Sequence, residues 1–370
     1  MKRIYPLLGT LCLIAATAPL WAQSHPYDPP PKCSRTPVDL VICLDTSGSM
    51  TALIDSARAE LWDIVNQVAR MEPTPHLRVG LLTYGSPNRA CAAQGYVVRQ
   101  TDLTNDLDTV YARMMAMSTN GGEEFVGWVL NDAIKTMSWS TDPRAKKLIF
   151  VCGNESADQA AHVFNFRSIA ELARAKGIVI HSIFAGDRLA GVREMWQEVA
   201  LHGGGTYEAI DMNEGTYQIA APQDKILIEL NARLNATYIP YGDRGRAGWE
   251  NQQEQDRNAA RMGEQAAGGR IVAKATAVYS NESWDLVDAA ASGDVKVEDV
   301  PDEQLPESMQ KMTVKQRKTY VEETRKTRAE IQKRIQQVNE EREEHIKKER
   351  QKRGSQKKSL GQAVRKALAD

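Results

Sequence analysis

Two patterns of apolar residues alternate along the chain from residue 37 to residue 236. Short runs of consecutive apolar residues are typical of strands buried on both faces of a sheet. Longer segments with apolar residues three and four positions apart are typical of helices with one buried face. The short runs predict strands at 38–44, 77–84, 96–100, 147–152, 178–184 and 206–210. The periodic segments predict helices at 52–70, 106–117, 125–137, 166–176, 192–201 and 224–234.

This alternation predicts the α/β class, with a doubly wound, mostly parallel sheet that has helices on both faces. In such sheets, ligands bind at the carboxyl ends of the strands. Asp45 directly follows the first predicted strand, and Gly153, Asn154 and Glu155 follow a central one. We therefore expect these residues to lie on the same edge of the sheet.

The loop Asp45-Thr46-Ser47-Gly48-Ser49 is the most informative segment of the sequence. It offers one carboxylate and two hydroxyls, from Asp45, Ser47 and Ser49, in a tight turn that Gly48 allows. Hard oxygen donors of this kind suit Mg²⁺ or Ca²⁺ and leave positions for water or an external ligand. The alternative is a loop whose hydroxyls only cap the following helix. Its place after an apolar strand favours the metal site.

The pattern Asp45-x-Ser47-x-Ser49 after a Val-Ile-Cys-Leu strand resembles the metal-ion-dependent adhesion site (MIDAS) of the von Willebrand factor type A domain. The similarity extends over about residues 38–236. The resemblance implies a central, mostly parallel sheet and binding of a protein partner that depends on Mg²⁺, Mn²⁺ or Ca²⁺. The partner would bind at the rim around the metal loop, with an acidic residue of its own completing the metal shell.

Other segments support this resemblance. Residues 78–84 are similar to the family's second strand, and Gly121-Gly122 precede its third helix. Residues 152–155 and 238–242 further resemble an exported bacterial branch of the family that carries a charged C-terminal tail.

Two positions depart from the family pattern. Where the family offers a threonine hydroxyl, this sequence has Glu124, preceded by Glu123. The aspartate of the family's third loop falls at Gly153, which leaves Asn154 and Glu155 as the nearest oxygen donors. The resemblance thus extends the expected metal ligands to Glu124, Asn154 and Glu155. The alternative is that Glu123 and Glu124 only stabilise the N-terminus of a helix.

The N-terminus has the features of a secretory signal. Lys2 and Arg3 precede an apolar run, and Ala22 stands before a polar stretch. The run is short for a membrane span and is interrupted by proline and glycine. We therefore expect a cleaved signal at 1–22, a proline-rich leader at 23–36, and a periplasmic or secreted protein that is not transmembrane.

Charge divides the chain near residue 310. Residues 311–370 carry 19 Lys and Arg against 9 Asp and Glu, whereas the preceding part is acidic. We expect a von Willebrand factor type A domain at 37–236, an irregular extension and linker at 237–309, and a charged helical tail at 310–370 that is separate from the domain.

Thr313 and Gln316 predict a capping box at the start of the tail helix. The helix has a thin apolar stripe with a weak coiled-coil pattern, which Arg317, Arg328 and Arg342 interrupt. A coiled coil and a solvated single helix are both open interpretations.

The cysteines fit an oxidising compartment but do not indicate a metal site. Cys43 and Cys152 lie in apolar runs and are expected to be buried thiols. Cys33 and Cys91 lie in loop-like sequence, where a bridge between them is one open pairing. The sequence has no Cys-x-x-Cys pair or histidine cluster, so a zinc site is not predicted.

Two other functions are alternatives. A metal-dependent hydrolase of the periplasm is disfavoured, because the sequence has neither a Gly-x-Ser-x-Gly motif nor the second aspartate of a phosphoryl-transfer loop. We expect no catalytic residues. The basic tail is expected to contact an anionic envelope surface rather than nucleic acid, since it has almost no aromatic residues.

Overall fold

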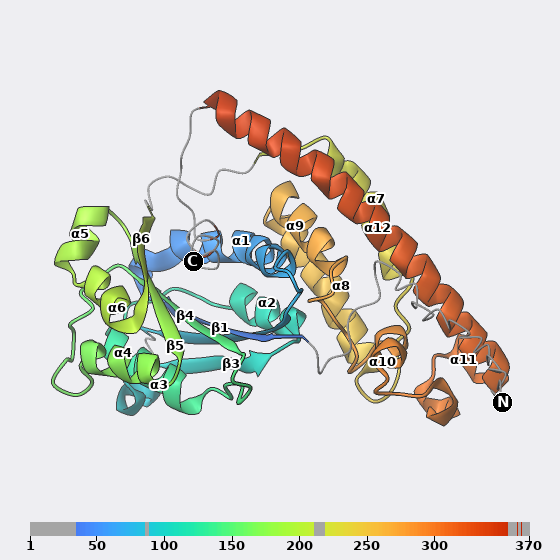
Figure 1. Cartoon of the computed structure of the whole chain (residues 1–370), viewed down its shortest axis with the longest axis horizontal. Coiled ribbons are helices and arrows are strands. Elements are labelled where there is room, and N and C mark those ends of the chain that lie inside the picture. Colours follow the sequence, from blue (N-terminus) through green and yellow to red (C-terminus); the bar gives the residue numbers. More distant parts are fainter. Residues whose placement is uncertain (1–34, 86–88, 211–218, 354–360, 362–363, 365–370) are drawn as a thin grey trace, which may run out of the picture.

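The computed structural model describes residues 35–85, 89–210, 219–353, 361 and 364. A six-stranded sheet in the order β3-β2-β1-β4-β5-β6 forms the centre of residues 37–210, and every neighbouring pair is parallel except β2 with β3 (Figure 1). The predicted fold class is confirmed. The strands are β1 (Pro37–Asp45), β2 (His76–Tyr84), β3 (Val98–Thr104), β4 (Lys146–Gly153), β5 (Ile178–Ala185) and β6 (Gly204–Ile210).

Helices cover both faces of this sheet because both faces are apolar. In β1, Leu40 and Leu44 pack into one apolar cluster, whereas Val41 and Cys43 pack into the other. The first cluster includes α1 (Thr51–Ala69), α2 (Leu107–Met115) and α7 (Gln223–Asn235). The second includes α3 (Val126–Thr136), α4 (Phe166–Ala175) and α6 (Trp196–Gly203), and α5 (Arg188–Arg193) packs beside α6.

Residues 237–309 are not the irregular extension that the sequence predicted. The reason is visible in α9, where residues 266–275 are buried all round, so that no exposed face produces a helical period. Asn66 of α1 donates to the carbonyl of Gly269 at 2.9 Å and joins α9 to the sheet domain. The segment contains α8 (Gly245–Arg261), α9 (Glu264–Lys274), α10 (Leu286–Ser292), α11 (Glu307–Gln310) and two 3-10 turns, η4 (Val297–Asp299) and η5 (Asp302–Gln304).

Charged side chains buried around α9 are paired. Arg270 donates to Asp108 of α2 at 2.5 Å and to Asp256 of α8 at 2.6 Å. Lys274 also donates to Asp256, at 2.9 Å. Because a buried charge is costly unless it has a partner, these pairs fix how the helices of the extension lie against the sheet domain.

The charged helix α12 (Val314–Arg353) starts where the sequence predicted. The amide of Thr313 donates to the Gln316 side chain at 2.8 Å, and the amide of Gln316 donates to Thr313 Oγ1 at 3.3 Å. The capping box is therefore confirmed.

The expectation of a separate tail is wrong for α12, which lies along α7 and contacts α9 (Figure 1). Ile331, Ile335 and Val338 of its apolar stripe belong to the same apolar cluster as α1 and β1, whereas Val321 and Ile346 belong to two other clusters. These five residues are buried within this chain, whereas Val314 at the start of the stripe is exposed. The three arginines that interrupt the stripe pair with acids of the body: Arg317 with Asp302 at 2.7 Å, Arg328 with Asp285 at 2.6 Å and Arg342 with Asp224 at 2.6 Å.

Several expectations concern residues outside the described ranges. The signal at 1–22, nearly all of the leader at 23–36 and Cys33 are among them, so the Cys33–Cys91 bridge stays a prediction. Cys43 and Cys152 are free and buried, as expected. Within the part of the chain that the structure describes, no helix combines the length and apolar character needed to cross a membrane.

Candidate metal centre

The metal loop lies at the carboxyl end of β1. The amide of Ser47 donates to Asp45 Oδ1 at 2.7 Å, which turns the chain tightly after the strand. The hydroxyl oxygens of Ser47 and Ser49 lie 3.2 Å apart. The amide and the hydroxyl of Thr46 both donate to the carbonyl of Tyr84, each at 2.9 Å. Thr46 therefore fastens the loop to β2 and leaves Asp45, Ser47 and Ser49 as the oxygen donors.

Glu124 approaches this loop from the segment before α3. The first turn of α3 contains no acidic residue, and Glu124 is buried, which does not fit a charge that only stabilises a helix end. Gly85 shows where the two carboxyl groups meet. A Cβ placed there would lie 2.9 Å from Asp45 Oδ1 and 3.4 Å from Glu124 Cγ. The neighbouring Glu123 is exposed.

Gly85 is a position of the candidate site that the sequence alone did not indicate. Its φ of +72° lies in the left-handed region, which favours glycine. Any side chain there would also enter the space between Asp45 and Glu124. The signal in the sequence was a glycine directly after the apolar run of β2.

Burial perturbs both carboxyl groups. It raises the pKa of Asp45, and burial together with the nearby Asp45 raises the pKa of Glu124 to about 9. Asp45 Oδ2 and Glu124 Oε2 are buried without a hydrogen-bond partner. Two carboxyl groups held together away from water favour a positive charge between them. These residues therefore fit a divalent cation, which would supply the partner that each oxygen lacks.

The end of β4 brings a further donor to the loop. Asn154 Nδ2 donates to Ser49 Oγ at 2.9 Å, and Asn154 Oδ1 is buried without a partner. Glu155 is exposed at the rim, and its carboxylate accepts a hydrogen bond from Gln159 at 2.7 Å. Asn154 thus lies beside the loop with its amide nitrogen toward Ser49, and its unpartnered oxygen makes it a candidate ligand, whereas Glu155 lies at the edge of the site.

The missing acid at Gly153 has a steric cause. The Tyr84 hydroxyl donates to the carbonyl of Cys152 at 2.8 Å. A Cβ on Gly153 would overlap that hydroxyl and come within 2.9 Å of the Trp196 ring. Among the described residues, no three histidine, cysteine, aspartate or glutamate side chains converge as metal ligands. The donors that the loop, Glu124 and Asn154 offer to a cation are two carboxyl groups, two hydroxyls and one amide.

The profile of the von Willebrand factor type A domain matches residues 39–207 of this chain. Residues 39–207 form a von Willebrand factor type A (VWA) domain. This range contains Asp45, Ser47, Ser49, Glu124 and Asn154, so every donor of the candidate centre belongs to the VWA domain. No curated protein sequence matches the chain.

Solved structures resemble the chain at low identity. Proximal thread matrix protein 1 of the mussel byssus is 14% identical to this chain, with a TM-score of 0.37. The match covers 49% of this chain and 43% of that one. Another structure of the mussel protein has a zinc-occupied MIDAS motif. The SpRpn10 VWA domain is 15% identical with a TM-score of 0.37, over 50% of this chain and 100% of that one. The pilus adhesin SpaC from Lactobacillus rhamnosus GG is 14% identical with a TM-score of 0.36, over 50% of this chain and 29% of that one. The match thus spans less than half of the mussel protein and of the adhesin.

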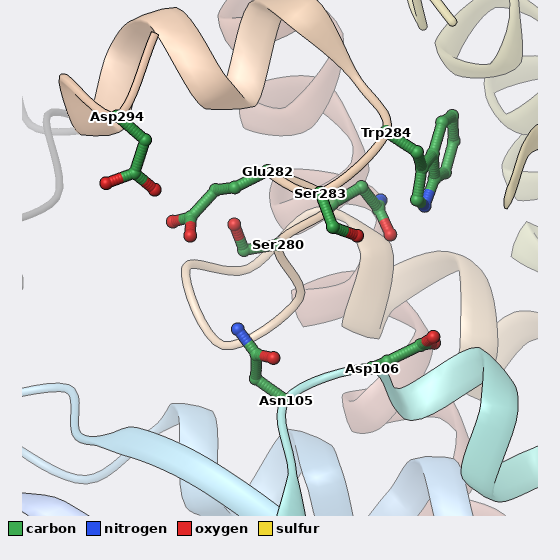
Figure 2. Close-up of a pocket in the computed structure, with 8 residues that line it drawn as sticks. Asn105, Asp106, Ser280, Glu282, Ser283, Trp284 and Asp294 are labelled. Atoms are coloured by element: carbon green, nitrogen blue, oxygen red, sulfur yellow. The ribbon is translucent and has the colours of Figure 1, made fainter. Parts of the chain in front are cut away.

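A polar hollow of about 260 Å³ lies where the VWA domain meets the C-terminal helices. Asn105 and Asp106 line it from the start of α2, and Glu282 and Asp294 line it from the opposite side (Figure 2). The Asp106 carboxylate already caps α2, because it accepts from the amide of Thr109 at 2.9 Å. The metal loop, whose acids have unpartnered oxygens, is the stronger candidate site.

Proposed function

We propose that this is an exported bacterial protein whose VWA domain binds a protein partner through a divalent cation. Mg²⁺ is the expected ion, with Mn²⁺ or Ca²⁺ as substitutes, and the proposed ligands are Asp45, Ser47, Ser49, Glu124 and Asn154. The observation that carries the proposal is the unpartnered, buried oxygen on each of Asp45, Glu124 and Asn154. Hard oxygen donors of this kind are the ligands that Mg²⁺ and Ca²⁺ prefer.

Binding is proposed rather than catalysis because of the kinds of side chain that form the centre. Its side chains are carboxyl groups, hydroxyls and an amide, which can hold a cation but do not form a pair of nucleophile and base. Asp45 and Glu124 are buried, whereas Ser49 is exposed. A cation held there would therefore be reached across the rim at Ser49, where an oxygen of the partner would complete its shell.

Calorimetry on the full mature chain tests the metal. Mg²⁺ or Mn²⁺ should bind the wild type and should not bind Asp45→Ala. The matched control is Asp243→Ala, which removes an exposed aspartate beyond the VWA domain and should bind like the wild type. Equal affinity in wild type and Asp45→Ala would refute the centre. Capture of a protein from envelope extract should then require both the cation and Asp45.

Export to the periplasm or the medium is proposed from the N-terminal residues. Mass determination of the protein isolated from its native compartment should give an N-terminus after Ala22, and retention of the first 22 residues would contradict export by a cleaved signal. Attachment to an anionic surface through the basic tail is the alternative. Arg317, Arg328 and Arg342 cannot contribute to it, because they are used in internal ion pairs, whereas Lys347, Lys348 and Lys352 are exposed.

A further inference from the structure

The rim of the candidate centre carries the negative charge of Glu155, which affects the kind of group that a partner can present there. We propose that the partner completes the metal shell with a neutral oxygen and brings a positively charged group to Glu155, instead of supplying a carboxylate to the cation. The neutral oxygen would be a carbonyl, an amide or a hydroxyl. This inference rests on the proposed cation site and assigns the kind of partner that the site accepts.

The first step is the charge of the loaded centre. Asp45 and Glu124 together carry two negative charges when they hold a divalent cation, so they neutralise it. Ser47, Ser49 and Asn154 contribute neutral oxygens only. A neutral centre offers an incoming carboxylate little Coulomb attraction in return for the carboxylate's loss of water.

The second step is Glu155, which directly follows the proposed ligand Asn154 at the end of β4. It is exposed, and the side chain that donates to it, Gln159, is a neutral amide that holds the carboxylate without neutralising it. Arg167, farther along the same segment, is already paired with Asp158 at 2.8 Å and with Glu198 at 2.6 Å. The loaded centre and Glu155 together therefore carry a net negative charge toward the partner.

The third step is the position of Glu155. Its backbone carbonyl accepts from the indole of the buried Trp196 at 2.7 Å. The adjoining Ala157 donates to the carbonyl of Glu194 at 3.0 Å. These two bonds hold the backbone directly after Asn154, and the bond from Gln159 holds the Glu155 carboxylate, so a negative charge lies beside a neutral donor. A partner that fits both presents a neutral oxygen next to a lysine or arginine.

The test uses the full mature chain loaded with Mn²⁺, whose paramagnetism broadens the proton signals of a bound peptide. Two probes are compared, acetyl-Gly-Asn-Arg-Gly-amide and acetyl-Gly-Asp-Ala-Gly-amide. The Asn-Arg peptide should bind about fivefold or more tightly than the Asp-Ala peptide, the size expected of one charge interaction near a protein surface. Glu155→Gln should remove about fivefold of this preference. The matched control is Glu229→Gln on the exposed side of α7, which makes the same charge change and should leave the preference intact.

The outcomes separate this inference from the proposed function. Tighter binding of the Asp-Ala peptide, equal binding of the two peptides, or a preference that Glu155→Gln leaves unchanged would each overturn the inference while Mn²⁺ binding stands. Electron paramagnetic resonance measures Mn²⁺ binding independently on the same samples. If the wild type binds no Mn²⁺, or if Asp45→Ala binds it equally, the proposed cation site itself is wrong.

Discussion

Two regions of this molecule bury acidic side chains, and they do so in opposite ways. Where α12 packs on the body, Asp285 is paired with Arg328 and Asp224 with Arg342, each at 2.6 Å. In the VWA domain, Glu124 is buried beside another acid, Asp45, and each keeps an unpartnered oxygen. A buried acid with its cation in place is part of the fold, whereas a buried acid without one indicates a position for a ligand.

Removing an arginine from the region where α12 packs on the body should lower the free energy of unfolding most. Arg328→Ala leaves the buried Asp285 and the partly exposed Asp288 without their partner, and breaking a buried pair costs about 3–5 kcal/mol. Urea unfolding of the full chain measures this loss. The control is Arg246→Ala, whose exposed pair with Glu250 should contribute no measurable stability. Equal stability of the two variants would show that the arginines of α12 do not hold it to the body.

Adding a metal ion to the region of Asp45 and Glu124 should change the stability of the fold by the next largest amount. A ligand that binds only the folded state stabilises it by about 2.7 kcal/mol at a hundred times its Kd. Mg²⁺ at that concentration should raise the melting temperature of the wild type, and a chelator should reverse the change. Asp45→Ala should show no response. A similar rise in that variant would mean that Mg²⁺ acts elsewhere on the molecule.

A side chain at Gly153 tests why the open site lacks a third acid. Gly153→Ala places a Cβ on the Tyr84 hydroxyl and near Trp196, and overpacking of this kind costs about 1–3 kcal/mol. Gly121→Ala is the control, because no atom lies within 4 Å of the Cβ that it adds. In a Tyr84→Phe background the cost of Gly153→Ala should be smaller, since the overlapping hydroxyl is gone. Independent, additive costs would refute the steric explanation.

Replacing one of the two unpaired acids should have the smallest effect on the fold and a measurable effect on binding. Glu124→Thr should weaken metal affinity by about tenfold, or about 1.4 kcal/mol, because one charged ligand becomes neutral. The same change should strengthen binding of the Asp-Ala peptide, since the cation keeps more positive charge. Calorimetry and peptide titration on one preparation measure both. If both properties fall together, Glu124 supports the loop in another way, and if neither changes, it is not a ligand.

The candidate centre was largely predictable because most of it is local in sequence. Asp45, Ser47 and Ser49 occupy one loop, and the apolar run before them predicted the strand that ends at Asp45. Glu124 and Asn154 were predicted only through the family resemblance. Gly85 was missed, because its importance depends on two carboxyl groups that meet above it from different loops.

The C-terminal part was less predictable because its helices bury polar residues. α9 contains Arg270 and Lys274 on buried positions, and residues 266–275 have no exposed face that would mark them as an amphipathic helix. Patterns that depend on residues close in sequence were still informative there, since the capping box at Thr313 and Gln316 predicted the start of α12 correctly.

The sequence by itself determined the α/β order of the VWA domain, the metal loop and the start of the charged helix, since each depends on residues a few positions apart. Only the tertiary structure decided the role of the arginines in α12. Arg317, Arg328 and Arg342 look like interruptions of an apolar stripe, yet their partners stand 15, 43 and 118 residues away. Whether a charge disrupts a helix face or anchors it depends on what lies opposite, and spacing along the chain does not contain that information.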